Sequence, residues 1–175
     1  MQDTSAIDWP AAIHHVFKQH TITQVAYVPD AGHRRLIELC HADHELRTVP
    51  LTTEEEGVGL LAGAWLGGAR GALLMQSSGV GNCINALASL TQSCRLPLLL
   101  LVTMRGEWGE GNPWQIAMGR AVQPVLETIG LRCVSVSRAG EVEATVAAMA
   151  SMSFNAGSAN AVLLSQRLVG AKVFQ

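Results

Sequence analysis

The sequence predicts an α/β fold: a doubly wound, mostly parallel six-stranded sheet with helices on both faces. Six short runs rich in β-branched or aliphatic residues alternate with longer stretches of helical character, which is the pattern of successive βαβ units. The run at 96–102 is continuously apolar, as expected of a strand covered on both faces. Residues 1–175 show no internal repeat, low-complexity segment or linker, so we expect a single domain.

The strands are expected at 23–28, 46–51, 71–75, 96–102, 131–136 and 161–165. The helices between them are expected at 33–41, 53–66, 81–92, 116–129 and 140–152. In such sheets ligands bind beyond the carboxyl ends of the strands. A site is therefore expected in the segments 29–33, 50–56, 76–82 and 103–115, where the unusual residues gather.

Composition limits the classes of function. The chain is 49% hydrophobic and 15% charged, and its mean hydropathy is +0.24. This is apolar for a soluble chain, so either its core is deep or another chain covers part of its surface. The net charge of −2 and the absence of a Lys/Arg run argue against a nucleic-acid partner.

Nothing in the sequence indicates a membrane or an oxidising compartment. The first ten residues lack the basic and apolar regions of a secretory signal, and the longest apolar run is too short to span a bilayer. The cysteines are widely spaced and form no CxxC, which favours reduced thiols and a cytoplasmic location: Cys40, Cys83, Cys94 and Cys133.

Three adjacent glutamates open the helix expected at 53–66. They have a structural interpretation, because Thr52 or Thr53 can cap the helix and acidic residues suit its first turn. However, Glu54, Glu55 and Glu56 repel one another, and one of them must face the strand-end crevice. A carboxylate in that place is a candidate for proton transfer.

Two glycine-containing segments follow. Segment 57–63 resembles a dinucleotide fingerprint, but the preceding glutamates would repel a pyrophosphate. Close packing explains it better, because small residues make one side of this helix thin: Gly59, Ala62, Gly63 and Gly67. Segment 76–82 is either an ordinary turn capped by Ser78 or Asn82, or a backbone surface that lies against a ligand.

The histidines differ in how well their positions suit a metal site or a catalytic residue. His41 and His44 stand near Cys40 and Asp43, but this segment has the character of an exposed helix end, so we expect no metal site in this chain. His33 lies where the first strand passes into its helix and is a candidate catalytic residue. A GxSxG nucleophile elbow is missing, which argues against hydrolase chemistry.

Segments 54–65 (EEEGVGLLAGAW) and 75–90 (MQSSGVGNCINALASL) together resemble the pyrimidine-binding domain of thiamin-diphosphate enzymes. The resemblance is closest to sulfopyruvate decarboxylase alpha subunits and to phosphonopyruvate decarboxylases, whose turn typically reads MQNSGxGN; here Ser77 replaces the usual Asn. Arg105-Gly-Glu107 matches an RGE of the same families, and the similarity runs from Val28-Pro-Asp30 almost to the end of the chain.

The resemblance implies an activity and a site. In that family a glutamate at the start of this helix contacts the aminopyrimidine ring of the cofactor and helps to remove the proton of the thiazolium carbon, which then attacks a 2-oxo acid. Counting nine positions back from Gly63, as in the wider superfamily, gives Glu54, with Glu55 as the rival. The resemblance further implies cofactor contacts by Pro29, Gln76, Ser78, Gly79, Gly81 and Asn82, and substrate contacts by Arg105 and Gln115.

The resemblance also implies a partner. Its members hold Mg²⁺ and the diphosphate through a GDG motif in a separate domain, and no GDG occurs in these 175 residues. We therefore expect a beta subunit that carries the GDG motif and binds Mg²⁺, in a hetero-oligomer such as two alpha and two beta chains. The alternatives are a carboligase subunit, a decarboxylase subunit for an aromatic or aliphatic 2-oxo acid, or a non-catalytic binding module.

Overall fold

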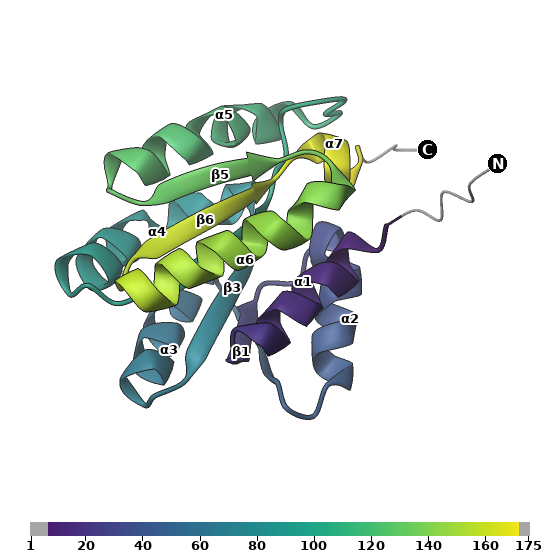
Figure 1. Cartoon of the computed structure of the whole chain (residues 1–175). Helices are drawn as coiled ribbons and strands as arrows, with labels where there is room; N and C mark the ends of the chain where they lie inside the picture. The colour runs from purple at the N-terminus through teal and green to yellow at the C-terminus, as the bar shows by residue number, and fades with distance from the viewer. Residues whose placement is uncertain (1–6, 172–175) are drawn as a thin grey trace.

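A computed structural model describes residues 7–171 and confirms the predicted fold class. Its six strands form one sheet in the order β2-β1-β3-β4-β6-β5 (Figure 1). Every neighbouring pair is parallel. The strands are β1 (Ile22–Tyr27), β2 (Arg47–Pro50), β3 (Arg70–Gln76), β4 (Leu98–Thr103), β5 (Arg132–Val136) and β6 (Ala159–Leu164).

Helices cover both faces of the sheet, and each layer has its own apolar cluster. One face carries α1 (Trp9–Gln19), α2 (Arg34–Ala42) and α6 (Ala139–Ala156). The other carries α3 (Glu54–Leu66), α4 (Val80–Ala86) with its π-helical continuation Leu87–Ser93, and α5 (Pro113–Thr128). Short helical turns follow three strands at the same edge: Ala31–His33, Ser77–Gly79 and α7 (Gln166–Val169).

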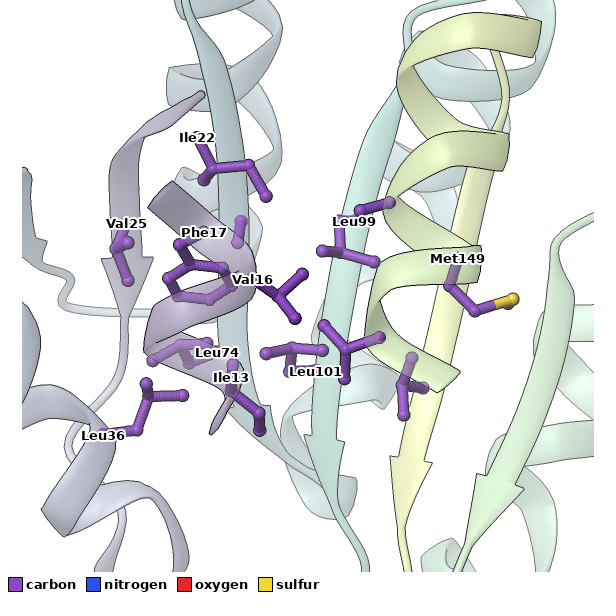
Figure 2. Packing of buried hydrophobic residues seen from close by; sticks show 14 of the residues in the cluster. Ile13, Val16, Phe17, Ile22, Val25, Leu36, Leu74, Leu99, Leu101 and Met149 are labelled. Atoms are coloured by element: carbon purple, nitrogen blue, oxygen red, sulfur yellow. The ribbon is translucent and has the colours of Figure 1, made fainter. Parts of the chain in front are cut away.

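The central strands supply both clusters through their alternating side chains. Leu99 and Leu101 of β4 point towards α1 and α6 (Figure 2), whereas Leu100 belongs to the cluster under α3 and α4. All six residues of β4 are buried, as its unbroken apolar run predicts. The sheet is therefore held from both faces, and its strand ends are fixed points from which the loops start.

The structure differs from the sequence prediction at three helices. Helix α1 was not predicted, although Asp8 accepts a hydrogen bond from Ala11 N at 3.2 Å and Pro10 stands in the first turn. Helix α5 begins at Pro113, three residues before the predicted start, because proline suits the first helical position. Helix α6 continues to Ala156, where Gly157 ends it in a left-handed conformation.

The strand order creates a crevice at one edge. The chain passes from β1 outward to β2 and then returns to β3 on the other side of β1. The connections on either side of this point run over opposite faces, and ligands of open α/β sheets bind there. Within residues 7–171, no helix is both long and apolar enough to cross a membrane.

Candidate functional site

Glu54 is the buried member of the three adjacent glutamates. It is the first residue of α3, directly after β2 and its loop, and its exposed fraction is 8%. Glu55 and Glu56 are exposed. Glu56 completes the helix start, since its Oε2 accepts a hydrogen bond from Thr52 N at 2.9 Å, whereas Thr53, the residue before the helix, makes no side-chain cap. The structure therefore separates the capping glutamate from the glutamate that lies in the crevice.

The turn after β3 receives the Glu54 side chain. A Cβ on Gly79 would overlap Glu54 Oε1 and would lie 2.6 Å from its Cγ, so only glycine allows this approach. Asn82, in the first turn of α4, donates a hydrogen bond from Nδ2 to Glu54 Oε2 at 3.2 Å. Burial and then the charge of Glu54 raise the pKa of the neighbouring Cys83 thiol to about 12, so this thiol is neutral.

A chain of hydrogen bonds joins the ends of β1, β3 and β4. Asp30 Oδ1 accepts from Gln76 Nε2 at 2.8 Å, and Asp30 Oδ2 accepts from Thr103 Oγ1 at 2.7 Å. Gln76 Oε1 in turn accepts from Ser78 Oγ at 3.0 Å and from Gln115 Nε2 at 2.9 Å. Because Asp30 can only accept, it fixes which way the Gln76 amide points, and Gln76 fixes Gln115.

The same bonds set the charge of Asp30. Burial disfavours its ionised form, but the hydrogen bonds from Thr103 and Gln76 outweigh burial and lower the pKa of Asp30 below its ordinary value. The carboxylate is thus ionised, and the described groups that donate hydrogen bonds to it are all neutral. Gln115 Oε1 is buried and has no hydrogen-bond partner among the described residues.

His33 lies beneath this network and is completely buried. Its Nε2 is 3.0 Å from the carbonyl oxygen of Leu101, and its Nδ1 has no partner in the described part of the chain. Burial lowers the pKa of His33, and Asp30 offsets this only in part. A neutral, fully covered ring supports the turn after β1 but offers no exposed surface to a substrate, so its predicted catalytic role stays a prediction.

Arg105 and Glu110 form a buried ion pair in the loop after β4. Arg105 Nε and Nη2 donate to the two carboxylate oxygens of Glu110 at 2.8 and 2.7 Å, and the side chains are 6% and 4% exposed. The Arg105 guanidinium lowers the pKa of Glu110 to about 2. The charge of Arg105, predicted to contact substrate, is therefore already matched within the chain.

Gln166 anchors this loop to the end of β6. It is fully buried; its Oε1 accepts from the backbone N–H groups of Glu107 and Trp108, and its Nε2 donates to Glu110 at 3.0 Å. Glu107 Oε2 accepts from Gln166 N at 2.9 Å in return. Glu107 of the RGE motif thus joins two loops.

A small cavity of about 150 Å³ lies between these loops. Its lining includes Asp30, Gly32, Thr103 and Arg105 from the ends of β1 and β4, and Val169–Ala171 at the end of α7 and just after it. Pro29 and Ser78 are exposed near the same strand ends, and Gly81 is exposed at the start of α4. The predicted residues thus lie at one edge of the sheet, with Glu54 and Asn82 beside the turn after β3 and Arg105 in the loop after β4.

Sequence reasoning missed four residues that shape this edge: Asp30, Thr103, Glu110 and Gln166. Asp30 stood within a quoted motif, and its place directly after a strand was a usable signal. Thr103 is the last residue of β4 and the first of the segment 103–115, where a site is expected, but no role is predicted for it. Glu110 pairs with Arg105 only five positions away. The contacts of Gln166 with Glu110 and Glu107, however, join residues 56 and 59 positions apart. No local pattern could have revealed them.

Comparison with known proteins identifies the family. The sulfopyruvate decarboxylase alpha subunit of Methanocaldococcus jannaschii is 41% identical over 116 residues, which are 66% of this chain and 69% of that subunit. That of Methanothermobacter thermautotrophicus is 34% identical over 158 residues, 90% of this chain and 96% of that one. The chain belongs to the family of sulfopyruvate decarboxylase alpha subunits.

This membership confirms the family predicted from the motifs and the class of decarboxylase subunits. A phosphonopyruvate decarboxylase of Streptomyces viridochromogenes is also similar, at 38% identity over 61% of this alpha-subunit chain but only 27% of that longer enzyme. No family model matches the sequence. A 2-oxoglutarate:ferredoxin oxidoreductase from Magnetococcus marinus has the same fold, with a TM-score of 0.72 and 12% identity over 92% of this chain and 29% of that one.

The Arg105–Glu110 pair predicts a pH-dependent contribution to stability. Glu110 has a folded pKa of about 2 against roughly 4.3 when unfolded. The pair therefore stabilises the fold fully above about pH 4.3 and loses this contribution as the pH falls towards 2. In urea unfolding, Glu110→Gln should lower the free energy of unfolding by up to about 3 kcal/mol at pH 7, and the difference from wild type should shrink below pH 4.

The matched control is Glu141→Gln. Glu141 pairs with Arg138 on the surface, where the side chains are 45% and 78% exposed, so its loss should change the free energy of unfolding little. Equal costs for the two variants at pH 7 would contradict the assignment of Arg105–Glu110 as a structural ion pair.

Proposed function

We propose that this chain is the subunit of a thiamin-diphosphate-dependent 2-oxo acid decarboxylase that carries the proton-transferring carboxylate, Glu54. One observation supports this above all. Glu54 Oε2 is held by Asn82, while Oε1 accepts no hydrogen bond from the described residues and lies against the backbone of Gly79. A carboxylate with one committed and one free oxygen, in the crevice of an α/β sheet, is arranged to exchange a proton with a ligand.

The surrounding residues fit an aromatic ring at this place. Gly79 leaves the turn after β3 without a side chain beside Glu54, and the neutral Cys83 adds no competing charge. Thiamin diphosphate, when bound, supplies the carbon nucleophile and the electron sink for decarboxylation. Glu54 Oε1 holds or moves one proton at a ring nitrogen of the aminopyrimidine. Gln76 and Ser78 would border the ring, since Asp30 fixes the orientation of the Gln76 amide and Gln76 Oε1 accepts a hydrogen bond from Ser78.

We further propose a 2-oxo acid with an acidic group on its third carbon as the substrate, as the names of the relatives suggest. Arg105 and Gln115 are retained as substrate contacts. Arg105 lines the cavity, but Glu110 matches its charge, so it contributes hydrogen bonds rather than net positive charge. Gln115 offers the unpartnered oxygen Oε1.

A partner subunit completes this site in our proposal. The described residues contain no group of three or more His, Cys, Asp or Glu side chains that could hold a metal ion, and no GDG motif occurs in the sequence. The thin side of α3 supports a partner surface: nothing in the described part of the chain approaches Gly59 or Gly63, and Leu66 is 76% exposed. We propose a GDG-containing beta subunit that binds Mg²⁺ and the diphosphate.

The assignment of Glu54 predicts a selective loss. Glu54→Gln in the assembled complex should slow proton–deuterium exchange at the thiazolium carbon by at least ~10²-fold, because an amide of equal shape cannot relay the proton. Glu55→Gln is the matched control, since Glu55 is exposed and should cost no more than roughly 0.3–1 kcal/mol of stability. Slow exchange in the Glu55 variant with normal exchange in the Glu54 variant would transfer the role to Glu55.

The shared site predicts partner-dependent binding. Calorimetric titration of the isolated chain with thiamin diphosphate and Mg²⁺ should give weak or undetectable binding, because the chain offers only the pyrimidine side of the site. The same titration of the complex should give tight binding that requires Mg²⁺. Tight, Mg²⁺-dependent binding by the isolated chain would contradict the two-subunit proposal.

The substrate class predicts an order of rates. The complex should decarboxylate a 3-sulfonated or 3-phosphonated pyruvate faster than pyruvate in a steady-state assay. Trp108 and Trp114 are 49% and 73% exposed in the loop after β4 and at the start of α5. They favour a bulkier substrate as the second candidate. A preference for aromatic or branched 2-oxo acids would therefore replace the sulfonate or phosphonate assignment.

A further inference from the structure

Asn82 is the only described side chain that hydrogen-bonds to the Glu54 carboxylate. We propose that Asn82 is a positioning residue, which holds Glu54 Oε2 so that Oε1 is the oxygen presented to the cofactor ring. This inference rests on the proposed function, and it assigns Asn82 to the glutamate rather than to direct binding of the cofactor. It follows from where the two helices begin.

Helices α3 and α4 start side by side at the strand edge. Glu54 is the first residue of α3, and Asn82 is the third residue of α4. Between them lies Gly79, whose missing side chain lets the carboxylate approach the turn. A glutamate side chain has several rotatable bonds, and a single backbone contact does not choose among their settings. The hydrogen bond from Asn82 supplies the second contact that fixes the carboxylate.

The chemistry of the pair makes the contribution of Asn82 specific. An ionised carboxylate only accepts hydrogen bonds, and the amide Nδ2 of Asn82 only donates. Such a bond to a charged group is stronger than one between neutral groups. Aspartate at position 82 would keep the size of the side chain but replace the donor by a second carboxylate. At low pH the two carboxylates would share one proton and restore a hydrogen bond.

Two other ionisable groups lie close enough to matter. Glu55 of α3 and Glu54 both raise the pKa of Cys83 in α4, after burial as the largest cause. The Cys83 thiol, with a pKa of about 12, stays neutral between pH 5 and 8. Glu55 is present in every variant considered below. A pH-dependent difference between two substitutions at residue 82 therefore reports on the residue introduced there.

The test compares Asn82→Ala and Asn82→Asp with wild type in the assembled complex. Asn82→Ala should slow thiazolium proton exchange about tenfold, the equivalent of one hydrogen bond to a charged group, and change the calorimetric Kd for thiamin diphosphate less than about twofold. Asn82→Asp should exchange more slowly than Asn82→Ala at pH 8, and its deficit should shrink towards pH 5. Crystals of the cofactor-free Asn82→Ala complex should show more than one Glu54 conformation.

Asn85→Asp is the matched control. Asn85 lies one turn further along α4, is exposed, and accepts a hydrogen bond from Ser89 at 3.4 Å. A carboxylate there should leave exchange and affinity unchanged. The proposal is wrong if Asn82→Ala exchanges at the wild-type rate, or if affinity falls in proportion to the rate, which would make Asn82 a direct cofactor contact. Normal exchange in Glu54→Gln would instead overturn the proposed function itself.

Discussion

The Glu54 carboxylate lies where it does only because residue 79 has no side chain. Any Cβ there would clash with Glu54 Oε1, so the position of the glutamate depends on the turn after β3. Glycine is not required here by its own backbone angles, since φ at Gly79 is −68°, which other residues adopt freely. It is required by the neighbour. This explains why the acidic start of α3 and the glycine turn, 25 positions apart in the chain, have to be interpreted together.

The opposite side of the crevice is built by tying loops to each other. Glu110 and Gln166 hold the loop after β4, and Glu107 bonds back to the start of α7. These are buried polar groups whose partners are nearly all present, so each removal would leave another group unsatisfied. Rigid strand ends under a cross-linked loop give a preorganised edge. The apolar clusters on both faces, of which Figure 2 shows the one under α1 and α6, keep those strand ends in register.

Local sequence patterns predicted the strands, the helices and the region of the site. They did not predict the hydrogen bonds between residues that are distant in the chain. The six strands, the helices between them and the site at their carboxyl ends followed from periodicity and from the single buried apolar run at β4. Counting back from Gly63 chose Glu54, which is the glutamate that the structure buries. The predicted thin side of α3 receives no element of the described chain at Gly59 or Gly63. Asp30 and Gln166 required the fold, because their partners are set by topology, not by neighbours in sequence. The Arg105 partner of Glu110, by contrast, lies only five positions away in the same loop.

The charged groups at this edge differ in how completely they are paired with other groups of the chain. Asp30 is saturated by neutral donors, and Arg105 is neutralised by Glu110. Neither can change its protonation or its partner without breaking buried bonds. Glu54 alone among these three keeps an oxygen without a described partner. In our proposal the proton is exchanged through this oxygen of Glu54, whereas a proton on Asp30 would disrupt the hydrogen bonds that orient Gln76 and Gln115. Because Arg105 brings no unmatched positive charge, the charge of an acidic substrate has to be balanced by groups outside this cluster.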